Sequence, residues 1–455
     1  MKQDLSTLTA LNPLDGRYRN KTAKLSPYLS EYALIKYRLE IEIRYLIALS
    51  ENKILRKLTT KEKNLLYSLF LKFSVNDAFE IKKIEEETRH DAKAIEEYLR
   101  LKLLKTSLKD TVEMLHFGLT SEDISNIAYR LMIRDALDKV IYPTLKSLAQ
   151  ELFQMSKKYK SVVILGRTHG QSAVPTTFGK ELAVFAQRVN KQIIELKKQT
   201  LTGKLNGAVG NFNALYFTYP DLDWLKFSKK FVSSFNLYPN LLTTQINPFE
   251  DIISIFQNLH RINGVILDFD TDIWRYISDG WIKLSVKTKE VGSSTMPQKV
   301  NPIDFENSEG NLTLANGLFE TINQKLYVSR LQRDLSNSTV IRNSGTVLGY
   351  SLLGYESALT GISRIDLNME RINEELEKDW SILSEALQTY LRKEGFKDSY
   401  NFISYQTKGK SFSKNSWQNL ILNLPIDKKH KDYLLRLTPK SYTGLAETLV
   451  GQLKA

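Results

Sequence analysis

The sequence predicts an all-α protein built from long helices. Glycine and proline, which interrupt helices, account for only 21 and 11 of the 455 residues. Long segments place apolar residues three and four positions apart, the spacing that aligns them along one side of a helix. The alternating patterns typical of strands are rare and short. Helices of this length favour an elongated bundle.

The first long helix is predicted to begin after Thr120. The sequence Thr120-Ser121-Glu122-Asp123 offers a hydroxyl side chain as the N-cap and acidic side chains for the positive end of the helix dipole. Pro143 is expected to kink this helix, because proline cannot donate the backbone hydrogen bond. The apolar stripe consists of Ile124, Ile127, Leu131, Leu137, Ile141, Leu145, Leu148 and Leu152.

Two further long helices are predicted along the chain. One extends from about Thr177 to Thr200, and the other begins near Ile252 and continues for about seven turns. Bundles of such helices commonly bury their remaining apolar face against copies of themselves, so a homo-oligomer is expected. The apolar stripe of the helix that begins near Ile252 consists of Ile252, Ile255, Phe256, Leu259, Ile262, Ile266, Phe269, Ile273 and Ile277.

The length of the chain favours more than one domain. With 455 residues, 42% of them hydrophobic, the chain can bury a large core. The long-helix region separates two flanking regions, so we expect an N-terminal helical domain over residues 1–110, a central bundle over residues 111–364 and a C-terminal helical domain over residues 365–455.

The composition excludes several kinds of site and location. There are no cysteines, so disulfides and cysteine-ligated metals are excluded and a cytoplasmic location is expected. No stretch approaches the roughly 20 apolar residues of a membrane span, and no signal-peptide pattern is present, so no membrane contact is expected. The net charge of +13 reflects either attraction of anionic partners or lysines on solvated helix faces. Because the basic residues are scattered, nucleic acid is not an expected partner.

One segment between predicted helices carries residues suited to catalysis. It is the sequence EVGSSTMPQKVNP, residues 290–302, whose glycine, serines and first proline disfavour a helix. Asn301 and Pro302 predict a helix start, with Asn301 as the N-cap and Pro302 at the first position. A serine hydroxyl, the ammonium of Lys299 and free backbone donors suit proton abstraction beside a carboxylate. On these grounds alone, a plain connector is the more common alternative.

The sequence GSSTMPQKVNP within this segment resembles the signature of the fumarase/aspartase superfamily. The resemblance implies a three-domain, all-α fold with a central bundle of long helices, assembled as a homotetramer whose active sites draw residues from three subunits. It also implies a lyase that releases fumarate from a succinyl-bearing substrate by anti β-elimination. Such a lyase uses no cofactor, and no metal site is expected.

Four further segments resemble the adenylosuccinate lyases, particularly their longer bacterial form. The similarity extends from near residue 8 to the C-terminus. It implies the release of fumarate from adenylosuccinate, which gives AMP, and from succinylaminoimidazole carboxamide ribotide (SAICAR), which gives AICAR. The segments are residues 303–311 (IDFENSEGN), residues 329–343 (SRLQRDLSNSTVIRN), residues 167–176 (RTHGQSAVPT), and Thr88-Arg-His-Asp91 together with Pro13-Leu-Asp-Gly-Arg-Tyr18.

The resemblance also assigns roles to individual residues. Ser293 is the expected base, Lys299 stabilises the dianion, and His169 is the acid that protonates the leaving nitrogen, while His90 places a second imidazole at the site. The basic run 330–342 suits the nucleotide phosphate. The expected substrate-binding residues are Arg17, Tyr18, Arg89, Asp91, Thr120, Ser121, Thr168, Gln245, Ser294, Asn301, Asn307, Arg333, Ser338 and Arg342.

Each assignment has a simpler alternative. A lone histidine is more often a hydrogen-bonded structural residue, which is the interpretation we give His116, His260 and His430. His90-Asp91 also fits an ordinary helix start with an incidental histidine. Gln298 stands where the similar bacterial proteins carry histidine, and Arg89 where some carry asparagine.

Two other functions stay open at the level of the sequence. The nearer one is another fumarate-releasing lyase, such as argininosuccinate lyase, against which the basic run 330–342 argues because that substrate has no phosphate. The other is a non-catalytic helical scaffold. It predicts loss of the loop serine, of Lys299 or of His169, and all three are present.

Overall fold

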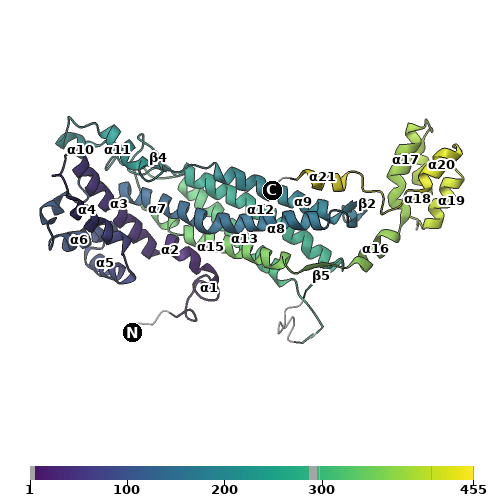
Figure 1. Ribbon diagram of the computed structural model, residues 1–455, viewed down its shortest axis with the longest axis horizontal. Coiled ribbons are helices and arrows are strands. Elements are labelled where there is room, and N and C mark those ends of the chain that lie inside the picture. Colours follow the sequence, from purple (N-terminus) through teal and green to yellow (C-terminus); the bar gives the residue numbers. More distant parts are fainter. Residues whose placement is uncertain (1–5, 286–294, 297, 411, 454–455) are drawn as a thin grey trace. The chain divides into compact units, whose positions relative to one another are not determined.

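The computed structural model describes residues 6–285, 295–296, 298–410 and 412–453. The described chain is mostly helical (Figure 1). It divides into two compact units. Unit 1 comprises Met1–Thr144, Ile193–Asn263 and Asn311–Gly354, and unit 2 comprises Leu145–Gln192, Gly264–Gly310 and Tyr355–Ala455. Five helices contribute residues to both units: α8 (Tyr142–Lys158), α9 (Phe178–Lys197), α12 (Glu250–Ser278), α13 (Ile303–Leu326) and α15 (Ser344–Ile362).

The other elements each belong to one unit. Those of unit 1 are α1 (Arg19–Thr22), α2 (Ser26–Leu29), α3 (Glu31–Glu51), α4 (Thr60–Leu71), α5 (Val75–Thr88), α6 (Asp91–Leu103), α7 (Ser121–Ala136), β3 (Thr202–Gly203), α10 (Asn213–Thr218), α11 (Trp224–Ser233), β4 (Tyr238–Pro239) and α14 (Ser336–Ile341). Those of unit 2 are β1 (Val163–Thr168), β2 (Gln171–Thr177), β5 (Ile282–Leu284), β6 (Ile365–Leu367), α16 (Met369–Glu377), α17 (Ser384–Lys393), α18 (Ser399–Thr407), α19 (Lys414–Leu422), α20 (Lys428–Leu435) and α21 (Ala446–Gln452).

The N-terminal helices of unit 1 form one hydrophobic cluster. Helices α3, α4, α5 and α6 bury aliphatic and aromatic side chains against one another, and α3 also packs along α7 (Figure 1). Local signals fix where these helices start. Thr59 and Glu62 form a capping box at α4, and Ser74 and Asp77 form another at α5, so backbone donors that the helix itself leaves unpaired are satisfied.

The predicted long helices are confirmed. Helix α7 begins at Ser121 with Thr120 as its N-cap, and the Thr120 N–H donates to the Asp123 carboxylate at 2.9 Å. Helices α9 and α12 cover the other two predicted segments. The residues of the two apolar stripes lie in the core, except Ile277, which is only partly buried. The all-α class therefore holds, with short strands in three two-stranded sheets across the described residues.

The irregularity expected at Pro143 is present as a π-turn. Residues Leu137–Ile141 form this turn between α7 and α8, and Pro143 is the second residue of α8. Proline has no N–H to donate, and it would clash with the carbonyl four residues earlier. The wider π-turn lets the chain pass this position while remaining helical.

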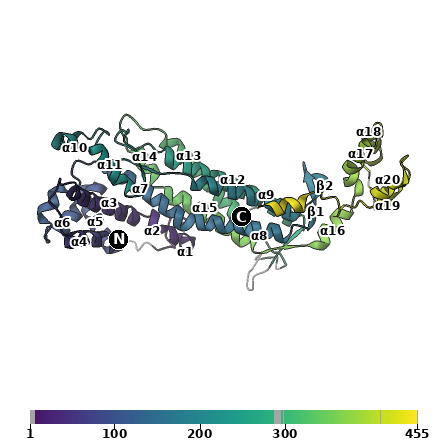
Figure 2. The same ribbon diagram turned by 45° about the horizontal axis from the view of Figure 1, so that its top comes forward.

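A β-hairpin in unit 2 is the main element that the sequence patterns do not predict. Strands β1 and β2 pair antiparallel, with Thr168 opposite Gln171, so His169 and Gly170 form a two-residue turn (Figure 2). Both turn residues have positive φ, 54° and 73°, as a type I′ turn requires. The register shifts at Gly166, where a Cβ would lie 2.5 Å from the Val174 carbonyl oxygen, so only glycine fits this bulge.

The helix start predicted at Asn301 is wrong by one residue. Helix α13 begins at Ile303, and the Pro302 carbonyl accepts the first helical hydrogen bonds from Phe305 and Glu306. Pro302 therefore occupies the N-cap and Asn301 precedes it. Asp304 does lie in the first turn, but its carboxylate pairs with Arg364 at 2.8 Å.

Within the described ranges, no helix is both long and apolar enough to cross a membrane. The domain limits at residues 110 and 364 stay a prediction.

Candidate active site

Three of the expected substrate-binding residues meet at the start of α7. The Arg333 guanidinium donates to the Ser121 hydroxyl at 3.3 Å and to the Gln245 amide oxygen at 3.2 Å. The same guanidinium pairs with the buried Glu122 carboxylate at 3.1 Å. Residues far apart in the sequence thus form one polar group at a helix N-terminus, where hydroxyls and backbone N–H groups face an anion favourably.

A buried network holds this helix start in place. Lys204 and Asp123 form an ion pair at 3.1 Å with both side chains fully buried. Asp123 also accepts from the backbone N–H groups of Asn206 and Gly207, so α7 is tied to the segment after β3. Burial raises the pKa of the neighbouring Glu122 carboxyl, although Arg333 opposes the shift. Burial lowers the pKa of Lys204, against the influence of Asp123.

Asp91 and Arg342 form a second group in unit 1. Asp91 accepts from Arg342 at 2.7 Å and from the nearly buried Arg38 at 2.8 Å, and Arg342 also pairs with Glu31 at 2.8 Å. Burial alone would raise the pKa of the Asp91 carboxyl, but Arg38 and Arg342 hold it below its ordinary value. Arg342 is therefore already paired with carboxylates, and an incoming phosphate has to compete with them.

His90 stands at the junction of α5 and α6. It is the N-cap of α6, and its Nδ1 accepts from the Lys93 N–H at 3.1 Å. Its ring lies 4.0 Å from the Asp91 carboxylate, which is turned toward the two arginines. Arg89 adopts a left-handed conformation, with φ 51°. The imidazole is more than half exposed, so the arrangement fits both a helix cap and a substrate contact.

His169 lies at the tip of the β1–β2 hairpin in unit 2. Its side chain and that of Thr168 are exposed. A left-handed backbone conformation costs free energy for a residue with a Cβ, and such residues gather at functional sites. Histidine is one of the residues found more often than most in this region, which agrees with its place in the turn.

The signature segment is only partly described. Ser293 and Ser294 lie outside the described residues. Lys299 is exposed, Asn301 is partly exposed just before α13, and Asn307 is exposed in the second turn of α13. The Arg364 guanidinium joins Asp304 in that helix to the carbonyl of Ser285, the last residue described before residue 295.

Three expected residues stay apart from both groups of unit 1. In the described part of the chain, the side chains of Arg17, Tyr18 and Ser338 make no hydrogen bond or ion pair with either group. Arg17 lies 5.9 Å from the ring centre of its neighbour Tyr18. No group of three or more His, Cys, Asp or Glu side chains suited to a metal ion occurs among the described residues.

The structural histidines have partners. His116 Nδ1 lies 2.5 Å from Glu42, His260 lies 3.5 Å from Glu320, and the Tyr390 hydroxyl lies 2.7 Å from His430. His116 precedes Thr120 by four residues and has a positive φ. Sequence patterns do not predict this backbone conformation.

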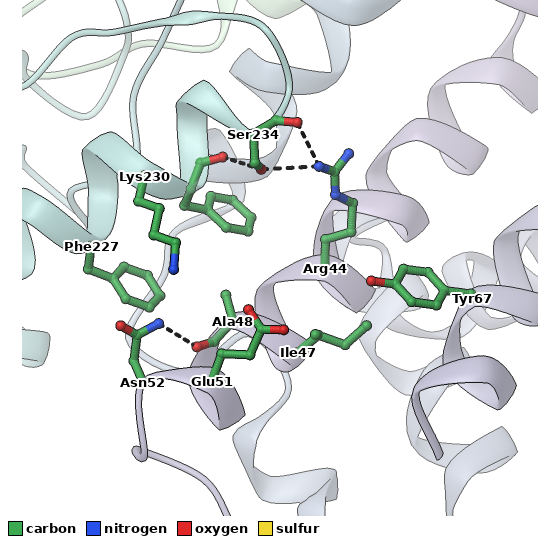
Figure 3. Close-up of a pocket in the computed structure, with 10 residues that line it drawn as sticks. Arg44, Ile47, Ala48, Glu51, Asn52, Tyr67, Phe227, Lys230 and Ser234 are labelled. Carbon is green, nitrogen blue, oxygen red and sulfur yellow. Dashed lines mark hydrogen bonds between the residues drawn. The ribbon is translucent and has the colours of Figure 1, made fainter. Parts of the chain in front are cut away.

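A pocket of about 150 Å³ lies elsewhere in unit 1. Figure 3 shows Arg44 turned toward Ser234, with Lys230 and Phe227 on the opposite wall. No residue of the expected site lines it. It is a separate feature between α3, α4 and α11.

Comparisons with known proteins identify the family of the chain. A lyase family model matches residues 16–317, and an adenylosuccinate lyase C-terminal model matches residues 329–443. The chain therefore belongs to the lyase family that the signature indicates. An adenylosuccinate lyase from Legionella pneumophila (strain Corby) is 44% identical over 450 residues, 98% of this chain and 99% of that protein. The one from Escherichia coli (strain K12) is 41% identical over 455 residues, 99% and 100% of the two chains. Within that family, the chain is a member of the adenylosuccinate lyases.

Solved structures with lower sequence identity share the fold. A fumarate lyase from Mesorhizobium has a TM-score of 0.78 at 17% identity and covers 95% of this chain and 97% of its own. A 3-carboxy-cis,cis-muconate lactonizing enzyme from Pseudomonas putida has a TM-score of 0.75 at 19% identity, with coverage of 95% and 96%. At these identities the likeness concerns the fold alone.

Proposed function

We propose that this protein releases fumarate from adenylosuccinate to give AMP, and from SAICAR to give AICAR. The observation that carries the proposal is the similarity to adenylosuccinate lyases over almost the whole chain. The group of Ser121, Gln245 and Arg333 at the α7 start supports it, because hydroxyl, amide and guanidinium donors suit the anionic ends of such a substrate.

The proposed elimination begins with proton removal. Ser293, as the alkoxide, takes the proton from the carbon next to a succinyl carboxylate. The electrons move into that carboxylate, and Lys299, Asn301 and the α13 N-terminus stabilise the resulting dianion. Collapse of the dianion breaks the carbon–nitrogen bond. His169 protonates the departing nitrogen, and fumarate and the aminated product leave.

The remaining residues are proposed to hold the nucleotide. Arg89, Arg333, Ser338 and Arg342 would contact the phosphate, and Arg17 and Tyr18 would reach the nucleotide from the N-terminal region. Thr120 and Ser121 would bind a succinyl carboxylate. Asp91 fits as the carboxylate that keeps Arg342 oriented until phosphate arrives.

We further propose a cytoplasmic homotetramer with active sites shared between subunits, acting without a cofactor, a membrane or nucleic acid. Exposed apolar side chains on α9 and α13 support burial against other copies, among them Val184, Ile194, Ile303 and Leu314.

The test is product analysis after incubating the purified protein with adenylosuccinate. We expect equimolar AMP and fumarate from the native chain and none from Ser293→Ala. Near-normal turnover by Ser293→Ala together with an inactive Ser294→Ala would move the base to Ser294. Turnover of argininosuccinate but not adenylosuccinate would overturn the substrate assignment. Inactivity toward both, from a folded tetramer, would favour the scaffold.

A further inference from the structure

His169 depends on its hairpin for its position. Within the described residues its imidazole makes no hydrogen bond or ion pair, and it lies in a two-residue turn. A general acid has to reach the nitrogen it protonates to within about 3 Å. Because nothing described holds the ring directly, the placement of the ring depends on where the base of the hairpin is fixed.

Arg167 fixes that base. It lies in β1, two residues before His169 and directly after the bulge at Gly166. Its guanidinium bonds the Asp279 carboxylate just after α12 and the Glu375 carboxylate of α16, the latter at 3.2 Å. One side chain therefore joins three separate segments of unit 2.

An aromatic stack completes this contact. The Arg167 guanidinium lies 4.8 Å from the ring centre of Trp281, and Trp281 stacks on Tyr276 at 5.4 Å and 13°. A guanidinium can bond carboxylates in its plane and an aromatic ring with its face, which a lysine ammonium cannot reproduce.

Other arginines contact the same carboxylates only from outside. Arg275 lies 3.4 Å from Asp279, and Arg371 lies 3.1 Å from Glu375. Their side chains are 63% and 45% exposed, against 23% for Arg167. Arg167 is thus the inner arginine of the group and the one that belongs to the hairpin.

A cavity lies beside the hairpin, so the contacts of Arg167 matter for where the hairpin is held. A cavity of about 620 Å³ is lined by Arg167, Thr168, Gly170, Tyr276 and Asp279, among others. Without Arg167, Asp279, which borders this cavity, and Glu375 would lose the cation that they share, and the hairpin would have room to shift.

We propose that Arg167 is a positioning residue for the elimination. It clamps the hairpin to Asp279 and Glu375 and so sets where His169 presents its proton. The proposal rests on the proposed function of His169 as the general acid. It assigns Arg167 no contact with substrate, because its guanidinium is already occupied by protein groups.

The test compares Arg167→Gln with Arg188→Gln. Arg188 pairs with Asp268 at 2.5 Å in the same unit, so the control also removes an arginine–aspartate pair. We expect kcat of Arg167→Gln to fall about 100-fold, the scale of a displacement near 1 Å, with KM changed less than about threefold. Arg188→Gln should retain kcat within about twofold. Equal losses in both variants would overturn the proposal.

A double variant separates positioning from plain destabilisation. In a His169→Gln background, Arg167→Gln should change kcat less than about twofold, because the group through which it acts is gone. If the double variant instead lost kcat by the product of the two single losses, the proposal would be overturned. Should Arg167→Gln fail to fold, Arg167→Lys keeps a cation and loses the planar fork. It should show an intermediate loss of kcat with the same dependence on His169.

A second readout does not require turnover. The chain has only five histidines, so the imidazole carbon-bound proton resonances can be resolved by NMR, and His169→Gln assigns one of them. We expect Arg167→Gln to shift or broaden that resonance and leave the other four unchanged. An unchanged His169 resonance would refute the clamp. Inactivity of the native chain toward adenylosuccinate would instead refute the proposed function while this measurement still reports on the hairpin.

Discussion

The pair of His116 and Glu42 holds the loop that leads to the start of α7. His116 has a left-handed backbone with φ 53°, and its ring is held 2.5 Å from the buried Glu42 carboxylate. Burial alone would lower the pKa of His116, but the charge and hydrogen bond of Glu42 raise it above its ordinary value. The pair therefore holds a strained residue in the loop that leads to Thr120 and Ser121.

We predict that His116→Gln loses more stability at pH 6 than at pH 9. Because the folded pKa of His116 is raised, its contribution is complete below the unfolded value near 6.5 and disappears as pH rises through the folded value. The loss at pH 6 should be about 1–3 kcal/mol. Urea unfolding at both pH values measures it, and a loss that does not change with pH would contradict the charged pair.

Arg333 gives a residue-scale prediction about binding. Arg333→Lys keeps the charge but cannot contact Ser121, Gln245 and Glu122 together. We expect KM for adenylosuccinate to rise about tenfold, with a smaller change in kcat, because the residue acts in binding. Steady-state kinetics measure KM and kcat, with Arg188→Gln as the control. An unchanged KM would mean that Arg333 does not bind the substrate.

At the scale of elements, α12 carries a carboxyl group in its packed face. Asp270 is 1% exposed, and neither of its oxygens meets ordinary hydrogen-bond geometry with a described residue, although the nearby Ser308 hydroxyl opposes part of the effect of burial on its pKa. Burial raises the pKa of its carboxyl well above the ordinary value. The folded protein therefore favours the neutral acid.

We predict that Asp270→Asn stabilises the protein, and more at pH 8 than at pH 5. A carboxyl group with a raised folded pKa contributes stability that is complete below its unfolded value near 3.9 and is lost as pH rises. The neutral amide avoids that loss, so a gain of about 1–3 kcal/mol is expected at pH 8. Urea unfolding at both pH values tests this. Destabilisation at pH 8 would mean that the carboxylate has a favourable role.

The sequence patterns predict the long helices well because their signals are local. The α7 cap and the stripes of α7 and α12 need only neighbouring residues. The α13 start is misplaced by one residue because Pro302 can occupy either the N-cap or the first position. The hairpin is missed because its turn is His169-Gly170 and not the usual asparagine–glycine or aspartate–glycine pair.

The site is less predictable from its residues than the helices are. Ser121, Gln245 and Arg333 meet only because the tertiary packing of unit 1 brings them together, and no periodicity encodes that contact. The family resemblance supplied these residues. It did not supply their partners, such as Glu122, or the carboxylates that occupy Arg342 and Arg167.

At the scale of the whole molecule, the proposed catalytic groups are spread over the chain. Arg333 and its partners lie in unit 1, while His169 and Lys299 lie in unit 2. Apolar side chains also stay exposed on long helices, as with Leu314, which is 56% exposed. The exposed apolar side chains support the proposed association with other copies of the chain.

Shared sites predict complementation between two variants that each lack one catalytic group and most of the native activity. If Ser293 and His169 reach one site from different subunits, mixed tetramers of Ser293→Ala and His169→Gln contain some sites with both native residues. Random mixing of equal amounts should restore about one quarter of native activity, since each position is native with a chance of about one half. Activity is measured after the two variants are denatured together and refolded.

The matched control mixes Ser293→Ala with a chain that carries both substitutions, which leaves no native Ser293 and should stay inactive. Differently tagged chains establish whether mixed tetramers form. Mixed tetramers without activity would place Ser293 and His169 of each site on the same subunit, because no mixing then supplies an intact pair. Regained activity near one quarter requires the acid and the base to come from two chains, and the exposed helices would then bring the two groups together.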